Sequence, residues 1–356
     1  MGFWKGLKFV RHLINFRPMT QVTSVGVQYS QYPTSTPGIA SLAAACAAGF
    51  SHVIVNLPEF VSESLDAAEL SEFGSAASEF GVLAQFGVGC VGPVGGHDDV
   101  VAQLGRRIEA GRDAGSSEFF AYTRCERTGS PSIDIPTALG EQLEIIERNL
   151  RSLTPVLRAH GARLNLKTHE DLSSYEVERI VARLDPTYFG VSLDVANLVV
   201  RGEDPAEVSH RLAGLIRQTH LEDVALYPVA EGVRRRLRPV GDGVLDWEAI
   251  LAPLVGHGMP FFTLEHHRGR FDTPVFDRSW FVTEPHVTGA DVGQLFRMAI
   301  STREGVGAGR IPSLSALDTE VDPEELHEQL RRGKDFLLAT LSRIAAQQNP
   351  SIEEVS

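Results

Sequence analysis

"RLNLKTHEDLSSYEVERIVARLDPTYFGVSLDVAN", residues 163–197, carries the pattern on which the fold prediction rests. An apolar run leads into Lys167, His169 and Glu170, a helical pattern follows, and a second apolar run leads to Asp194. Strand, helix and strand in this order form a parallel βαβ unit, whose two strands end at the same edge of the sheet. The stretch therefore predicts a parallel sheet with polar side chains along its carboxyl edge.

The same unit recurs along the chain. Eight apolar runs of β type alternate with longer helical patterns, and the runs lie at 22–30, 51–57, 82–91, 118–124, 163–170, 188–197, 216–224 and 260–267. Eight such units over about 250 residues predict a closed (β/α)8 barrel, a TIM barrel, with an open doubly wound sheet as the alternative. The barrel is favoured because polar residues end successive runs, where barrel enzymes place their active sites.

Two segments exceed what a minimal barrel needs. Residues 226–243 follow the seventh strand and residues 268–310 follow the eighth, so we expect two long loops at the catalytic rim. A capped amphipathic pattern from Asp322 onward predicts a C-terminal helix that closes the barrel. The chain is thus divided into a mobile leader at 1–19, the barrel at 20–345 with its rim insertion at 268–310, and a tail at 346–356.

Composition limits the possible partners. The chain has 356 residues with 33 basic and 46 acidic side chains, and a net charge of -13 repels nucleic-acid backbones and anionic lipid. Three unpatterned cysteines indicate neither a disulfide framework nor a cysteine zinc site. Charges in the first 19 residues leave no apolar run for a signal peptide or a membrane span. We expect a cytoplasmic protein that binds neither nucleic acid nor membranes.

Four successive strand ends each carry a possible metal ligand: Glu170, Asp194, His220 and Glu265. One carboxylate or histidine at a strand end is ordinarily a surface residue, but four on neighbouring strands of a barrel indicate a site. Three carboxylates and one imidazole suit a divalent ion, Mn²⁺ or Mg²⁺, and leave coordination positions for two substrate oxygens.

The motifs "KTHEDLSS", "GVSLDVANLVVRGEDP", "RQTHLEDV", "PVGDGVLDWEAIL" and "FFTLEHH" carry a family resemblance. Over residues 22–270 the chain resembles the xylose-isomerase-like superfamily of sugar isomerases and epimerases. It departs from the family where many members have a metal-binding Glu followed by Asn-His, because this chain has Lys167, Thr168 and His169. A protonated lysine cannot bind a metal, so Glu170 is expected to supply the missing carboxylate.

The lysine also changes the expected chemistry. Superfamily epimerases use two opposed glutamates as bases, so a reaction with a single base is more consistent with Lys167. His169 is the expected base, since an imidazole titrates near neutral pH. Lys167 would stabilise an oxyanion, and the alternative is that it only neutralises the carboxylates around it.

A narrower resemblance concerns the reaction. "LKTHED", "DVANLVVRGEDP", "THLEDV" and "RRRLRPVGDGVLDW" are similar to the α subunits of C-glycoside deglycosidases and to 3-oxo-isoapionate decarboxylases. This implies a lyase, dependent on a divalent metal and most consistent with Mn²⁺, that cleaves a carbon–carbon bond of a 3-oxo C-glycoside through a metal-stabilised enolate. It also implies a small β subunit as partner. The alternatives are decarboxylation of a 3-oxo sugar acid and epimerisation or isomerisation of a free sugar.

Four further residues are predicted to bind the substrate. Gln28 and Asn56 end the first two strands and are expected to contact sugar hydroxyls. Arg236, in an arginine run, is expected to turn inward and hold a carboxylate or an enolate oxygen. Trp280 belongs to an aromatic group that would form a wall for a flat aglycone or a partner, or else would pack into a core of its own.

Two other classes of protein are disfavoured. A DNA-repair endonuclease of the same superfamily would need further strand-end histidines and a basic face, which this acidic chain lacks. A non-catalytic sugar-binding subunit would have a decayed metal site, whereas Asp194, His220 and Glu265 are all retained.

Overall fold

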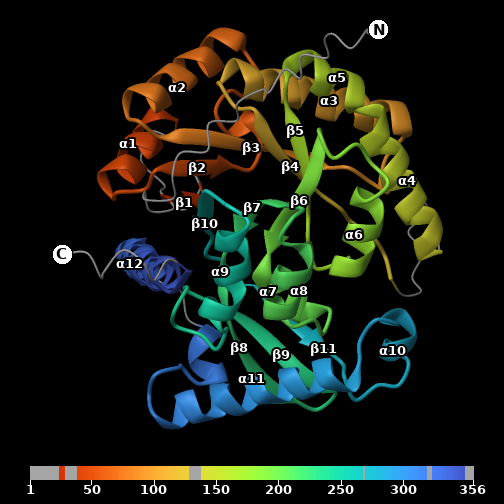
Figure 1. The fold of residues 1–356 in the computed structure, drawn as a ribbon, viewed down its shortest axis with the longest axis vertical. Helices are drawn as coiled ribbons and strands as arrows, with labels where there is room; N and C mark the ends of the chain where they lie inside the picture. Colours follow the sequence, from red (N-terminus) through yellow and green to blue (C-terminus); the bar gives the residue numbers. More distant parts are fainter. Residues whose placement is uncertain (1–23, 29–37, 128–137, 268, 319–322, 349–356) are drawn as a thin grey trace, which may run out of the picture.

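The computed structural model describes residues 24–28, 38–127, 138–267, 269–318 and 323–348. A parallel sheet surrounded by helices forms the larger part, and a small antiparallel sheet with its own helices lies beside it (Figure 1). The predicted leader at 1–19 lies outside the described residues, as does most of the predicted tail. No helix in the described ranges is long and apolar enough to cross a membrane.

The larger sheet is the predicted barrel. Its strands are β1 (Ser24–Gln28), β2 (His52–Val55), β3 (Leu83–Cys90), β4 (Glu118–Tyr122), β5 (Arg163–Lys167), β6 (Phe189–Asp194), β7 (Ile216–His220) and β10 (Phe261–Leu264). All neighbours pair in parallel in the order β10-β1-β2-β3-β4-β5-β6-β7, and a bridge between Leu221 and Leu264 joins the two ends. The eight predicted strands are confirmed, although most end earlier than the apolar runs do.

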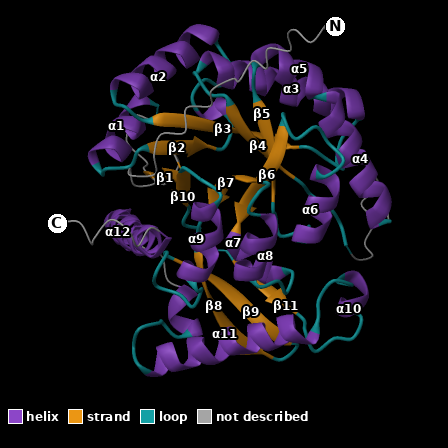
Figure 2. Ribbon diagram, in the orientation of Figure 1, coloured by secondary structure: helices purple, strands orange, loops and turns teal. Residues whose placement is uncertain are grey.

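Helices surround this sheet (Figure 2). They are α1 (Ile39–Ala47), α2 (Ala67–Glu79), α3 (His97–Asp113), α4 (Leu139–Ser152), α5 (Thr154–His160), α6 (Ser174–Val181), α7 (Val195–Val200), α8 (Pro205–Leu212), α9 (Trp247–Gly256) and α12 (Pro323–Gln348), with a short 3-10 helix, η2 (Pro58–Phe60). The predicted C-terminal helix is confirmed as α12, which packs against α9, β1 and β10 and so covers the last strand of the barrel.

Strand β5 shows how the sequence sets the two faces. Leu164 and Leu166 are buried among the hydrophobic core that the helices cover, and burial of one leucine contributes about 1.5–3 kcal/mol. Asn165 points the other way, into the barrel, where its amide donates to Glu118 Oε1 over 2.7 Å and to Gln218 Oε1 over 3.2 Å. The period of two therefore places Lys167, at the end of the strand, on the inner face.

The two segments predicted as long rim loops are structured. They supply most of β8 (Asp223–Val229), with β9 (Gly232–Arg238) and β11 (Arg270–Thr273), an antiparallel sheet in the order β11-β9-β8, together with α10 (Trp280–Thr283) and α11 (Gly289–Gly307). A 3-10 helix, η3 (Leu314–Asp318), follows them. Helix α11 packs on β8. The two long segments are present as predicted, but their internal strands were not expected, because three adjacent arginines hide the alternation of β9.

Candidate active site

A pocket of about 450 Å³ lies at the carboxyl ends of the barrel strands. Gln28, Asn56, Lys167, Asp194 and Glu265 line it, each at or just past the end of its strand. Strand β9 contributes a further wall. The predicted catalytic rim therefore encloses a cavity into which several polar side chains converge.

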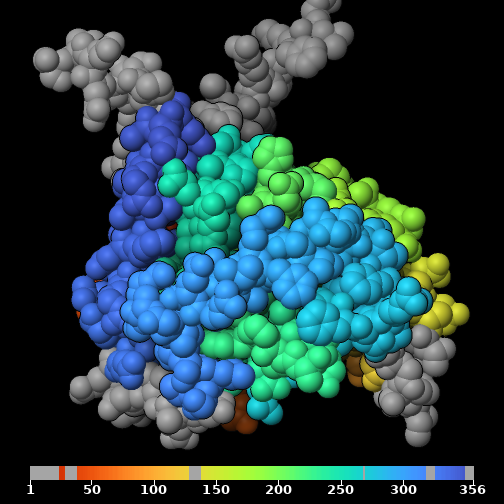
Figure 3. All heavy atoms as spheres, turned by 90° about the horizontal axis from the view of Figure 1, so that it is seen from below, coloured from red at the N-terminus to blue at the C-terminus, as the bar shows by residue number. Residues whose placement is uncertain are grey.

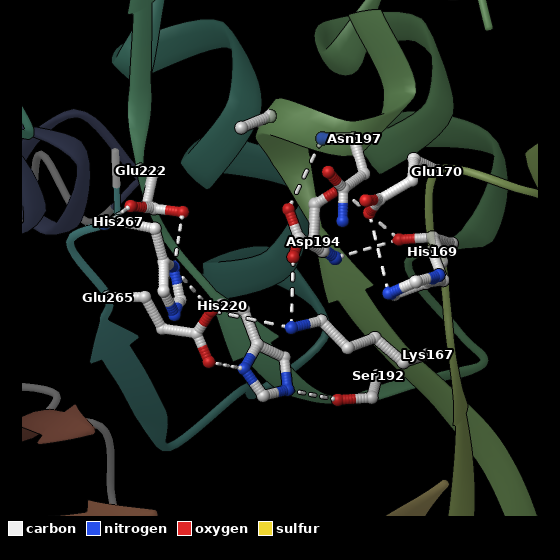
Figure 4. Close-up of polar contacts among 12 residues, drawn as sticks. Lys167, His169, Glu170, Ser192, Asp194, Asn197, His220, Glu222, Glu265 and His267 are labelled. Carbon is white, nitrogen blue, oxygen red and sulfur yellow. Dashed lines mark hydrogen bonds and ion pairs between the residues drawn. The ribbon is translucent and has the colours of Figure 1, made fainter. Parts of the chain in front are cut away.

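Lys167 lies at the centre of the polar contacts (Figure 4). Its ammonium nitrogen lies 3.0 Å from Asp194 Oδ2 and 3.3 Å from Glu265 Oε2. Burial alone would lower the pKa of Lys167, but Glu265 and Asp194 outweigh burial and raise it well above its ordinary value. The ammonium thus stays charged and occupies the place where a cation held by Asp194 and Glu265 would have to lie.

Glu265 is fixed from behind by His220. Nδ1 of His220 contacts Glu265 Oε1, and Nε2 lies 2.9 Å from Ser192 Oγ. Burial would raise the pKa of Glu265, but the charges of His220 and Lys167 hold it well below its ordinary range. Both nitrogens of the fully buried His220 are therefore occupied by protein groups, which makes it a support for Glu265.

His169 reaches the pocket from the loop after β5. Its Nδ1 lies 2.8 Å from Asp171 Oδ1, and Asp171 in turn accepts a hydrogen bond from the backbone of Cys125 over 2.5 Å. Burial would lower the pKa of His169, but the hydrogen bond to Asp171 raises it above its ordinary value. Nε2 lies 3.4 Å from Glu170 Oε2, whose side chain is 41% exposed. Asp171 thus orients the ring as a partner orients a catalytic imidazole.

The four predicted metal ligands do not converge on one point within the described chain. Glu170 lies beside His169, and Lys167 separates Asp194 from Glu265. A different donor group does converge: atoms of Glu222, Glu265 and His267 all lie within 4.8 Å of one another.

The sequence analysis did not single out Glu222 and His267, although each stands two positions after a predicted ligand. His267 Nδ1 lies 3.0 Å from Glu222 Oε2 and 3.7 Å from Glu265 Oε2. Burial would lower the pKa of His267, but the hydrogen bond to Glu222 and the nearby carboxylates raise it to about 9. Two carboxylates and one imidazole facing a pocket fit a divalent ion by donor chemistry.

The arginine run presents Arg235, not Arg236, to the pocket. Strand β9 alternates, so Arg236 lies on the opposite face, where its guanidinium contacts the carbonyl of Leu317. The register of β9 against β8 and β11 sets this choice, and the arginine run alone could not fix it. Arg236 is therefore corrected to a structural residue.

Of the other three residues predicted to bind the substrate, two line the pocket and one does not. Gln28 and Asn56 both line the pocket, and Gln28 Nε2 donates to Asn56 Oδ1 over 2.8 Å. Trp280 lies in a separate hydrophobic cluster with Val275 and Leu295 under α11. The pocket's aromatic residues are instead Phe60, Phe120 and Tyr122, so the expected wall from the 268–310 insertion does not form there.

Comparisons with known proteins agree with this architecture. The uncharacterised protein YihM of Escherichia coli is 24% identical over 117 residues, 33% of this chain and 36% of YihM. A 3-oxo-isoapionate decarboxylase of Pectobacterium atrosepticum is 25% identical over 190 residues, 53% of this chain and 62% of the decarboxylase. The matched part of the chain thus spans about a third of the length of YihM and somewhat under two thirds of the length of the decarboxylase.

A solved structure of D-psicose 3-epimerase with D-fructose has the same fold, with a TM-score of 0.61 at 13% identity, covering 89% of this chain and 99% of the epimerase. The family model described as xylose isomerase-like TIM barrel matches residues 42–286. The chain therefore belongs to the xylose isomerase-like TIM barrel family.

Proposed function

We propose that the protein is a carbon–carbon lyase that decarboxylates a 3-oxo sugar acid. The observation that carries the proposal is the pairing of a buried ammonium, Lys167, with an oriented imidazole, His169, at the end of one strand and in one pocket. The relative from Pectobacterium, named a 3-oxo-isoapionate decarboxylase, supports the same class of reaction. Replacement of the usual glutamate by Lys167 argues against a symmetric two-base epimerisation.

The bond-breaking step needs a group that accepts negative charge. In a 3-oxo acid the carboxylate is attached to the carbon next to the ketone, so loss of CO₂ sends the bonding electron pair to the ketone oxygen. Lys167 donates toward two carboxylates and has a third N–H for that oxygen. Such a preorganised donor in a partly buried site stabilises the developing enolate by about 3–4 kcal/mol.

The second step needs a proton. His169 in its protonated form gives the proton on Nε2 to the carbon that has lost CO₂, while Asp171 holds Nδ1. One carboxylate and one proton thus yield CO₂ and a ketone, and solvent then returns the proton to the ring. Gln28 and Asn56 bind hydroxyls and keep the chain of the sugar acid across the pocket.

A divalent ion fits beside this pair. Glu222, Glu265 and His267 would hold it, and when bound it would supply further positive charge for the ketone oxygen. Glu265 belongs to this donor group and also pairs with Lys167. It therefore fixes the ammonium relative to the ion's site.

The test offers the purified protein, loaded with Mn²⁺, three substrates: a 3-oxo sugar acid, a 3-oxo C-glycosyl flavonoid and a free ketose. We expect CO₂ only from the acid and loss of CO₂ release in His169→Ala. Aglycone release from the flavonoid without CO₂ from the acid would replace the proposal with the C-glycoside lyase. An epimerised ketose would replace it with the epimerase.

The C-glycoside lyase with a β subunit stays a second candidate because of one surface. The 268–310 insertion forms a large part of the face seen in Figure 3, and Phe276 is 57% exposed, Val282 81% and Ile300 46%. Phe276 also stacks on the exposed Phe296, and contiguous apolar patches often mark surfaces that bind a partner. Aglycone release that appears only after a β subunit is added, and disappears in Phe276→Ser, would support this candidate.

A further inference from the structure

We infer that Arg235, with Asn197, forms an anion-binding subsite that makes the pocket select sugars bearing a carboxylate over neutral sugars. The inference rests on the proposed function for the location of the substrate, and it adds the residue that recognises the acid group.

Arg235 is the pocket-facing member of β9. Only 4% of its surface is exposed, and its Nη1 donates to Asn197 Oδ1 over 2.9 Å and to Ala196 O over 3.2 Å. Within the described residues, no carboxylate lies within 4.0 Å of its guanidinium, its Nε is buried without a hydrogen-bond partner, and its Nη2 also has none. Both hydrogen bonds of the Arg235 guanidinium to the protein are therefore made by Nη1, and both go to neutral oxygens.

The adjacent arginine on the strand, Arg234, differs from Arg235 because it has a carboxylate partner. Arg234 Nε and Nη2 each lie 2.6 Å from an oxygen of Asp272, in an exposed ion pair. The chain thus pairs the arginine that water could solvate and leaves the buried Arg235 without a counter-ion. A buried charge without a partner is costly to a protein. We therefore attribute the unpaired guanidinium of Arg235 to a ligand that supplies the missing anion.

The free edge of the guanidinium has the right shape for a carboxylate. Nε and Nη2 lie side by side, and a carboxylate binds such an edge with parallel hydrogen bonds. Gly269 lies next to this edge: a Cβ at that position would come within 3.3 Å of Arg235 Nη2 and 3.0 Å of Leu237 Cδ1. Asn197 adds a side-chain amide whose NH₂ has no partner in the described chain.

The charge of the pocket permits an anion. Glu170, Asp194 and Glu222 act on Arg235 from beyond ion-pair distance. Lys167 already pairs with Asp194 and Glu265, and His267 pairs with Glu222. The exposed Arg124 is a further lining cation. The carboxylates are thus largely balanced by other cations, which leaves the charge of Arg235 available.

The test compares D-gluconate with D-glucitol. The two differ only at C1, where gluconate has a carboxylate and glucitol has a CH₂OH group. Calorimetric dissociation constants are measured for the wild type, Arg235→Gln, Arg235→Lys and the matched control Arg234→Gln. The wild type and the control are expected to bind gluconate about 10- to 100-fold more tightly than glucitol. Arg235→Gln should lose this preference without weakening glucitol binding, and Arg235→Lys should keep part of it.

The inference is overturned if the wild type does not prefer gluconate, or if Arg235→Gln, folded by circular dichroism, keeps the preference. Binding is measured without turnover, so the outcome is separate from that of the proposed function. An acid preference that depends on Arg235 in a protein that releases no CO₂ would retain the subsite and reject the decarboxylase. CO₂ release with no role for Arg235 in binding would do the reverse.

Discussion

At the scale of single residues, the sequence placed Lys167, His169, Asp194 and Glu265 correctly at strand ends in one pocket, because a period of two and the end of each apolar run are local properties. It could not show that the ammonium of Lys167 would lie between two of the predicted ligands. That contact joins three strands, and no spacing within one strand determines it.

The metal ligands give the first prediction at this scale. Glu222→Gln should reduce the Mn²⁺ that remains bound after gel filtration by at least about tenfold, because its carboxylate belongs to the converging group. Glu170→Gln should retain the ion, since that side chain is 41% exposed beside His169. Elemental analysis of both variants measures this, and loss of metal in Glu170→Gln alone would restore the ligand set expected from the sequence.

Glu203 gives the second prediction at the scale of single residues. Burial raises its pKa to about 7, against the hydrogen bonds from Ser174 that lower it. The folded state therefore holds a proton that the unfolded state releases near pH 4.5, so this group's contribution to stability falls as pH rises to 7 and then levels off.

Glu203→Gln removes this dependence. Its free energy of unfolding relative to wild type should increase between pH 5 and pH 8 by up to about 3 kcal/mol, measured by urea denaturation. Glu207→Gln, an exposed carboxylate on α8, is the control and should show little change. An equal pH dependence in both variants would remove Glu203 as the cause.

At the scale of elements, the barrel strands and α12 followed from periodicity, whereas the sheet of β8, β9 and β11 did not. Strand β9 reads GVRRRLR, with charged residues on both faces, and β11 reads RFDT, which is only four residues long. The partner strands, not the residues of each segment, make these segments extended. This is also why Arg235 could not be told from Arg236 in advance.

The insertion is fastened to the barrel by buried ion pairs, which gives a third prediction. Glu284, 3% exposed, accepts from Arg127 Nη2 over 3.0 Å and from Arg201 Nη1 over 2.8 Å. Glu284→Ala leaves two buried guanidinium groups without this partner and should cost about 3–5 kcal/mol. Urea unfolding and the rate of proteolysis within 268–310 would both report the loss.

Asp272 of the same insertion, which pairs with Arg234 of β9 near the surface, is the matched control. Asp272→Ala should cost no more than about 1 kcal/mol, because exposed ion pairs contribute little. A loss in Glu284→Ala as small as that in Asp272→Ala would show that the network does not hold the insertion.

At the scale of the whole molecule, family membership fixes the barrel and its rim, but the reaction depends on which side chains converge there. Lys167, His169, Arg235 and the group of Glu222, Glu265 and His267 all line one pocket. In the roles proposed above, His169 donates the proton and Arg235 holds the carboxylate, which suits decarboxylation better than exchange of a proton between two faces.

The measurement that tests this account most directly is the reaction of a 3-oxo sugar acid in D₂O, followed by mass spectrometry and NMR of the ketone. The account predicts that the wild type releases CO₂ and leaves one deuterium, in a single configuration, on the carbon that carried the carboxylate, and that His169→Asn loses this product. Absence of CO₂, or deuterium placed equally on both faces by the wild type, would contradict it.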